Sequence, residues 1–325
     1  MKINIEKMEI ELGEITQLCG TNLNKKRFII DSIYKYFSGH RYTEYEENFV
    51  ENVKIDNSQI GRKYFDVIRI KSIDDLIVEL KISKTSAVMQ WINFQLEKIE
   101  YKFELEKVEE ALDGIYDNLN DVLVYNNIGI KFNYEIKSML EILQKSYVMP
   151  EQGEFLETKT GYELLKIYLK LLLELQRLMP QQKLIILENI DHIVSIDEYN
   201  KVIQIIKGII VNGNMRFILT TSLDGYVSVD KEILSGINVI NDEIFSFPEY
   251  EYLYKFILDN YPCQYIPSDD EVLEKIRWSI QKIGNNIAKL DFKSEIYLKL
   301  INKTLGIESN GYQRINQMEI SFICS

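Results

Sequence analysis

Residues 20–27 have the spacing of a phosphate-binding loop but lack part of its chemistry. They read GTNLNKKR, whereas a working loop has the form G-x-x-x-x-G-K-[ST]. In that form the glycines let backbone N–H groups wrap the phosphates, the lysine reaches the β and γ phosphates, and the hydroxyl holds magnesium. Gly20 and Lys26 match it, but Lys25 stands in place of the second glycine and Arg27 in place of the hydroxyl residue. A side chain at position 25 would obstruct a phosphate that approaches the backbone.

An acidic residue follows a strongly apolar run later in the chain. Residues 184–187 read LIIL, and Glu188 and Asn189 come next. In an ABC-type ATPase such an acid is followed by a glutamate that orients or activates water, and the neutral amide of Asn189 cannot take a proton. Residues 217–222, FILTTS, stand where a switch histidine would end the next strand, and Ser222 takes that place. The helix before the acid opens with LETKTGYELL (156–165) and lacks an LSGGQ-like signature.

These four segments occur in the order that an ATPase has, and each lacks its reactive or phosphate-facing residue. Random drift of a single motif would not produce that pattern. We therefore predict an ABC-like head that has lost its nucleotide chemistry and is not an enzyme. The degenerate nucleotide site of this prediction comprises Gly20, Lys25, Lys26, Arg27, Glu188 and Asn189.

The elements that must position these residues are those of an α/β protein. Apolar patterns predict a strand or hairpin over 3–12 and strands over 14–20, 63–70, 184–187 and 215–222. They also predict helices over 25–37 and 198–210. Because 184–187 contains no polar residue, it is typical of a strand buried in a parallel sheet. The order of strand, helix and strand over 184–222 indicates a right-handed crossover.

A long helical region interrupts this α/β pattern. Residues 83–124 have apolar residues three or four apart and predict a helix of about 60 Å, which Gly114 could interrupt. A turn over 126–133, a returning helix over 134–146 and a strong helix over 158–180 follow. Three short helices, over 249–261, 269–284 and 292–306, and a strand over 315–325 end the chain. We therefore expect a discontinuous head (1–75 and 180–245), an inserted helical leg (76–179) and a C-terminal helical extension (246–325).

The composition excludes several classes of protein. The 325 residues are 46% hydrophobic and have a formal net charge of −12, so a polyanion would bind only where cations gather on one surface, as inside an oligomer. Three scattered cysteines indicate a reduced cytoplasmic protein, and two histidines argue against a His-rich metal site. We expect no membrane segment, because neither a signal peptide nor an apolar run of about 20 residues is present.

The degenerate motifs in this order, the long helical leg and the acidic composition together resemble a known family. It is the accessory spacer-acquisition protein of type II-A CRISPR systems, in its longer form, and the resemblance covers roughly residues 1–245. It implies a ring-shaped homotetramer around a positively charged hole that accommodates double-stranded DNA. It further implies that linear DNA ends are bound without sequence readout, together with the integrase subunits and the effector nuclease, during adaptation in antiviral defence. Members have no established catalytic activity.

Short members of this family bind calcium through acidic residues near the leg. The corresponding stretch here is GIKFNYEIK (129–137), in which Glu135 is acidic while Lys131 and Asn133 are not. This departure argues against a calcium site of the family's kind, and we expect that no cofactor is required.

Binding to DNA phosphates needs only cations in a groove, and its affinity falls steeply with salt. The first candidates are Lys25, Lys26, Arg27, Arg62 and Lys63. Each of these residues is also compatible with an ordinary solvated side chain. Residues 25–27 have one further alternative, in which they neutralise neighbouring carboxylates and hold the empty loop closed. Two alternative functions stay open. One is an ABC- or SMC-like ATPase with unusual motifs, whose turnover Lys26→Ala would abolish, and the other is a protein-interaction scaffold without DNA binding.

Overall fold

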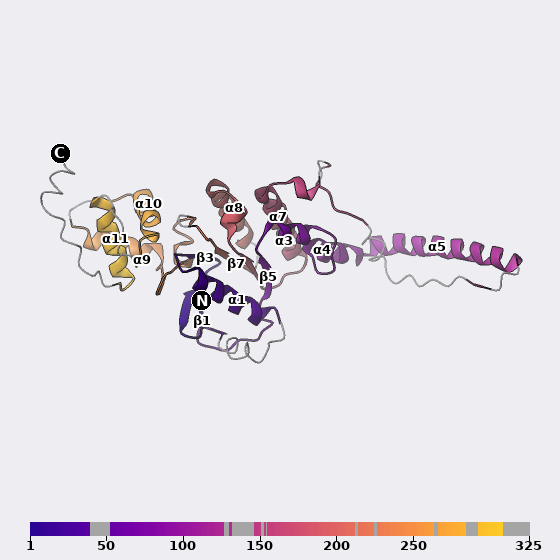
Figure 1. The fold of residues 1–325 in the computed structure, drawn as a ribbon, viewed down its shortest axis with the longest axis horizontal. Helices are drawn as coiled ribbons and strands as arrows, with labels where there is room; N and C mark the ends of the chain where they lie inside the picture. Colours follow the sequence, from indigo (N-terminus) through magenta and orange to yellow (C-terminus); the bar gives the residue numbers. More distant parts are fainter. Residues whose placement is uncertain are drawn as a thin grey trace. The chain divides into compact units, whose positions relative to one another are not determined.

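The computed structural model describes residues 1–39, 53–126, 130–131, 146–150, 153, 155–211, 214–223, 226–262, 266–283 and 292–307. The chain divides into two compact units. The first comprises Met1–Lys71 and Gln181–Ser325, and the second comprises Ser72–Pro180. The first unit contains the strands, whereas the described part of the second is built from helices (Figure 1).

A six-stranded sheet forms the centre of the first unit, in the order β5-β6-β7-β3-β8-β9. All neighbouring strands run parallel except the antiparallel pair β8 and β9. Both β3 and β6 are buried along their whole length, as strands in the interior of a parallel sheet should be. The predicted α/β class is therefore confirmed. The strands are β3 (Ile15–Cys19), β5 (Asp66–Ile70), β6 (Lys183–Leu187), β7 (Met215–Thr220), β8 (Ile237–Ile240) and β9 (Ile244–Ser246).

A second, antiparallel sheet contains residues 3–12, which form a hairpin, one of the two forms that the sequence predicted there. Its order is β2-β1-β4, with β1 (Lys2–Ile5), β2 (Met8–Glu11) and β4 (Val53–Ile55). Asn238 of β8 links this sheet to the larger one. The backbone N–H of Glu11 donates to Asn238 Oδ1 (2.9 Å), and Asn238 Nδ2 donates to the Glu11 carbonyl (3.0 Å). Strands β8 and β9 were not predicted, because both are short and Asn238 interrupts the apolar run of β8.

The helices of the first unit lie close to their predicted places. Helix α1 buries Ile29, Ile30 and Ile33 in a core shared with the large sheet, and the three C-terminal helices form a second core with β8. Helix α8 begins at Ser195, whose side chain forms a capping box with Glu198. The strand predicted over 315–325 lies outside the described residues. The elements are α1 (Leu23–Phe37), η2 (Ile190–His192), α8 (Ile196–Ile210), η3 (Leu234–Gly236), α9 (Tyr250–Asn260), α10 (Asp269–Ile280) and α11 (Phe292–Thr304).

The second unit is organised around α7, which packs against α3 and α4. Thr160 caps α7 and forms a capping box with Glu163, so the helix predicted over 158–180 is confirmed. Residues 127–129 and 132–145, where a turn and a returning helix were predicted, lie outside the described residues. The elements of this unit are α3 (Ile73–Leu80), α4 (Ala87–Leu96), α5 (Ile99–Tyr125), η1 (Leu156–Thr158) and α7 (Gly161–Leu178).

The prediction of one continuous helix over 83–124 is wrong. The chain forms α4 and α5 instead, and Lys98 between them has an extended backbone, with φ −70° and ψ 142°. The interruption falls where packing changes: α4 contacts α7 and buries Ala87 and Met89, whereas many apolar side chains of α5 are exposed. Gly114, the expected interruption, lies inside α5. Within the described part of the chain, no helix has the length and apolarity needed to cross a membrane.

Candidate functional site

The loop that carries Gly20 joins the carboxyl end of β3 to α1 and lies against the end of β8. Gly20 has φ +94°, and a Cβ atom there would lie 2.4 Å from the carbonyl oxygen of Ile240. Glycine is therefore required at this position by its backbone conformation and by the close approach of β8. The space beside this loop is occupied by protein backbone.

Several backbone N–H groups of the loop have acceptors within the protein. In a phosphate-binding loop such groups point at the ligand. Here Thr21 N donates to Asn241 Oδ1 (2.9 Å) and Asn22 N to the Ile240 carbonyl (3.1 Å). Lys25 N donates to Asn22 Oδ1 (3.0 Å), which caps α1, and Lys26 N to the Asn22 carbonyl (3.1 Å). A phosphate would have to displace these bonds in order to bind.

The side chain of Lys26 is turned into the protein. Its relative exposure is 4%, and its Nζ donates to the carbonyl oxygens of Gly20 (2.7 Å) and Thr221 (2.6 Å). The lysine thus joins the loop to the segment that follows β7. The two neighbouring cations have more exposed contacts than Lys26. Lys25 Nζ donates to the Asp242 carbonyl, and the exposed Arg27 lies 3.7 Å from Asp31.

Glu188, the acid that follows β6, is neutralised by Arg69 of the adjacent strand β5. Arg69 Nε and Nη2 lie 2.8 and 2.7 Å from Glu188 Oε2, and Nη1 lies 2.7 Å from Asp31 Oδ1. The Arg69 side chain is only 6% exposed, and its guanidinium lies 5.4 Å from the centroid of the Tyr34 ring. A protein cation therefore takes the charge-balancing role that a metal ion would have beside Glu188.

Asn189 and Ser222, which replace the expected catalytic residues, have structural contacts. Asn189 has φ 50° and ψ 50°, and its backbone N–H donates to Thr220 Oγ1 (2.9 Å). The buried carboxylate of Asp191 accepts from Ser222 N (2.9 Å), Ser222 Oγ (2.5 Å) and Leu223 N (2.9 Å). His192 Nε2 lies 2.8 Å from Ser222 Oγ. Asp191 holds the serine itself rather than orienting the imidazole, so this cluster lacks the geometry of a nucleophilic triad.

Arg62 and Lys63 do not join this site. Arg62 Nε donates to the carbonyl of Tyr36 (3.2 Å) in the last turn of α1, where a cation complements the helix dipole. Lys63 is its exposed neighbour. The predicted nucleotide-site residues 25–27 lie in the first turn of the same helix, so the candidate DNA-binding residues form two groups at opposite ends of α1.

Two residues of this closed site were missed from the sequence. Arg69 had a readable signal, because it is a charged residue within the apolar strand DVIRI. Asn241 had no readable signal in the sequence. Its Oδ1 accepts from both Thr21 N and Thr21 Oγ1, and its Nδ2 donates to the Ile283 carbonyl (2.6 Å). Asn241 thereby joins the loop to the segment that follows α10.

No group of three or more His, Cys, Asp or Glu residues within the described ranges is arranged to hold a metal ion. Glu135 and Asn133, which bear on the calcium question, lie outside these ranges, and Lys131 is exposed. The absence of a calcium site of the family's kind therefore stays a prediction.

Comparison with known proteins identifies the family. Residues 2–299 match the family model described as CRISPR-associated protein Csn2 subfamily St. The structure of Stu0660 of Streptococcus thermophilus superposes with a TM-score of 0.84 at 19% identity over 100% of both chains, which shows a shared fold. An SmcHead bound to the C-winged helix domain of ScpA matches with a TM-score of 0.42 at 12% identity, over 78% of this chain and 98% of that one. That similarity is too low to establish a shared fold, so the ABC-like head stays a prediction.

A comparison with curated proteins gives no match. The family model nevertheless spans most of the chain, and the family predicted from the sequence is confirmed. This chain belongs to the CRISPR-associated Csn2 proteins, subfamily St, the accessory spacer-acquisition family of type II-A CRISPR systems.

Proposed function

We propose that this protein binds the ends of double-stranded DNA without reading sequence and without catalysis, as a ring-shaped oligomer that supports spacer acquisition. Its role in CRISPR adaptation follows from its family. A homotetramer, contacts with the integrase subunits and the effector nuclease, a cytoplasmic location and independence from any cofactor belong to the same proposal.

The closed loop is the observation that carries the non-catalytic part of the proposal. A working ATPase needs free amide groups, an available lysine and an acid that can hold magnesium. In this chain several loop amides, among them those of Thr21 and Asn22, donate to protein acceptors. Lys26 is buried against two carbonyl groups, and Arg69 forms an ion pair with Glu188. ATP and magnesium would have to break all three arrangements, and an ATPase with unusual motifs is the less favoured function for that reason.

The charge of the chain decides how DNA could be bound. A net charge of −12 opposes association with a polyanion, unless cations from several copies gather around one lumen. Among the candidate residues, exposed Arg27 and Lys63 are suited to phosphate contact. Lys26 is buried and Arg62 is bound to the end of α1, so both suit a structural role better.

A salt-titrated binding assay with linear and closed circular duplex DNA tests this function, with the mass of the particle measured alongside. We expect linear duplex to bind and circular duplex to bind poorly, because a closed ring must be threaded by an end. The double substitution of Arg27 and Lys63 by alanine should weaken binding and reduce the salt slope by about one unit for each phosphate that is no longer neutralised. Arg177→Ala, which removes a guanidinium paired with Glu174, is the control. Equal binding of both DNA forms, or a single-copy particle, would contradict the proposal.

The surface of α5 favours a protein-interaction scaffold as the second candidate. Several large apolar side chains of this helix are exposed, which marks surfaces that contact other proteins. Absence of any DNA retardation at low salt would favour this function over DNA binding. The exposed residues are Tyr101, Phe103, Val108, Ile115, Leu119, Val122, Val124 and Tyr125.

A further inference from the structure

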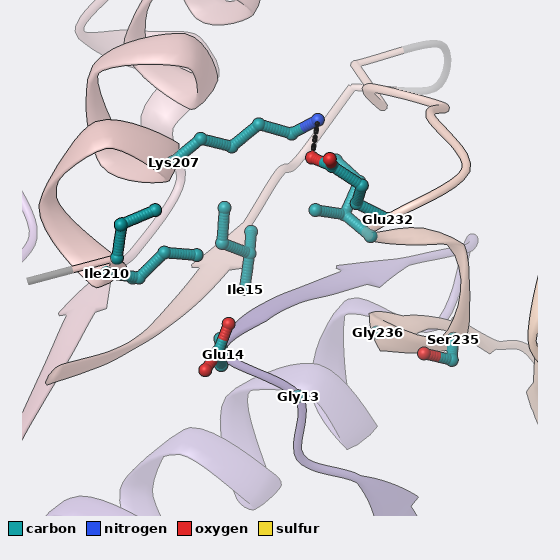
Figure 2. Close-up of a pocket in the computed structure, with 10 residues that line it drawn as sticks. Gly13, Glu14, Ile15, Lys207, Ile210, Glu232, Ser235 and Gly236 are labelled. Atoms are coloured by element: carbon teal, nitrogen blue, oxygen red, sulfur yellow. Dashed lines mark hydrogen bonds and ion pairs between the residues drawn. The ribbon is translucent and has the colours of Figure 1, made fainter. Parts of the chain in front are cut away.

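A cavity of about 450 Å³ lies at the end of the large sheet opposite to the Gly20 loop (Figure 2). Gly13, Glu14 and Ile15 form one wall, where β3 begins, whereas the Gly20 loop follows the other end of this strand. The last turn of α8 and the segment that leads into β8 form the remaining walls. All of these residues belong to the first unit.

The wall between β3 and β8 is set by backbone packing. A Cβ atom at Gly236 would lie 2.0 Å from the carbonyl oxygen of Ile15, so the two segments approach as closely as a glycine permits. The side chains of Ile15 and Ile233 on these segments are almost fully buried. The floor of the cavity is therefore made of closely packed backbone and buried apolar side chains.

The rim of the cavity carries excess negative charge. Lys207 Nζ lies 2.9 Å from Asp230 Oδ1 and 2.9 Å from Glu232 Oε2. Burial lowers the pKa of Lys207, but the hydrogen bonds and charges of these two carboxylates outweigh it and hold the pKa above its usual value. One ammonium between two carboxylates leaves one negative charge, and exposed Glu14 adds another. Arg216, whose Nη1 donates to the Leu12 carbonyl (3.4 Å) beside this wall, offsets one of the two, so one negative charge remains. Phosphate is therefore disfavoured in this cavity.

The acidic and apolar groups are arranged side by side. Figure 2 shows Glu14 and Glu232 on opposite sides of Ile15, with Ile210 of α8 beside it. A ligand that fits this arrangement has a cationic head on a short aliphatic stem. Arginine and lysine side chains have this construction, since their methylene groups lie on apolar surface while the charged head meets a carboxylate.

We propose that this pocket binds an arginine or lysine side chain of a partner polypeptide. The methylene groups contact Ile15 and Ile210, and the cationic head forms charge-assisted hydrogen bonds with Glu14 or Glu232. The site takes no part in the proposed DNA contacts, because its charge repels phosphate. A protein partner could thus bind here while DNA is held elsewhere.

The test follows the methyl signals of isoleucine in the full-length protein by NMR during titration with Nα-acetyl-arginine N-methylamide. We expect saturable shifts at Ile15, Ile210 and Ile233. The uncharged analogue Nα-acetyl-norleucine N-methylamide should produce none. The variant with Glu14→Gln and Glu232→Gln should bind the arginine probe at least about tenfold more weakly. That loss of affinity corresponds to about 1.4 kcal/mol of binding free energy. Glu243→Gln, which changes an exposed acid outside the cavity, should bind as the unmodified protein does.

Three results would overturn the proposal: no saturable shift with the arginine probe, equal shifts with norleucine, or unchanged affinity in the doubly substituted variant. A titration with spermidine distinguishes a free polyamine from a partner polypeptide. If spermidine binds and the arginine probe does not, the pocket takes a free polyamine and the partner-polypeptide source is rejected. Unchanged methyl signals elsewhere in the doubly substituted variant establish that it is folded.

Discussion

Replacing Arg69 with methionine is expected to lower the free energy of unfolding by roughly 3–5 kcal/mol, because it leaves a buried carboxylate without its cation. Arg69 is 6% exposed and Glu188 is 12% exposed, and the guanidinium also holds Asp31. Methionine keeps much of the side-chain volume, so the loss reports on charge rather than on a cavity. Denaturant unfolding of the variant, followed by fluorescence and circular dichroism, measures this loss.

Two further variants make the Arg69 experiment specific. Glu188→Gln in the Arg69→Met background should recover part of the lost stability, since it removes the uncompensated charge. Arg177→Ala breaks an ion pair in which both side chains are more than half exposed, and should change the free energy of unfolding by less than about 1 kcal/mol. If Arg69→Met costs no more than Arg177→Ala, then Arg69 does not hold the site closed.

Replacing Lys26 with methionine is expected to destabilise the protein by roughly 2–4 kcal/mol, because it removes the ammonium donor from the buried Thr221 carbonyl and the partly buried Gly20 carbonyl. In a working ATPase the same change would remove nucleotide binding instead. Lys25→Met is the matched control, since the Lys25 ammonium bonds to Asp242 at an exposed position, and it should cost less than about 1 kcal/mol. Unchanged stability in Lys26→Met would contradict the structural role of this lysine.

Local sequence patterns predict much of the fold. Strands β3, β6 and β7 are short runs of mainly apolar and β-branched residues, and α1, α7 and α8 have apolar residues at helical spacing. Neighbouring residues therefore contain their signal. Strands β8 and β9 have only four and three residues, which is too few for a periodic pattern. The break at Lys98 depends on where packing against α7 ends, and the residues around it do not encode that limit.

The sequence predicts which phosphate-binding residues the loop lacks, but it does not predict which residues contact the loop instead. Residue types alone indicate that Lys25, Arg27 and Asn189 cannot perform phosphate chemistry. The groups that close the site come from distant parts of the chain: Arg69 meets Glu188 across 119 positions, and Thr21 meets Asn241 across 220. Only the sheet order, which puts β5 beside β6 and β3 beside β8, brings them together.

Calorimetric titration of the protein with ATP and magnesium at millimolar concentration tests the central claim most directly. If Lys26, Arg69 and Asn241 close the loop as described, the titration should give no saturable heat, and no phosphate should be released over hours. Saturable ATP binding that requires magnesium and disappears in Lys26→Met would show instead that the site opens to nucleotide.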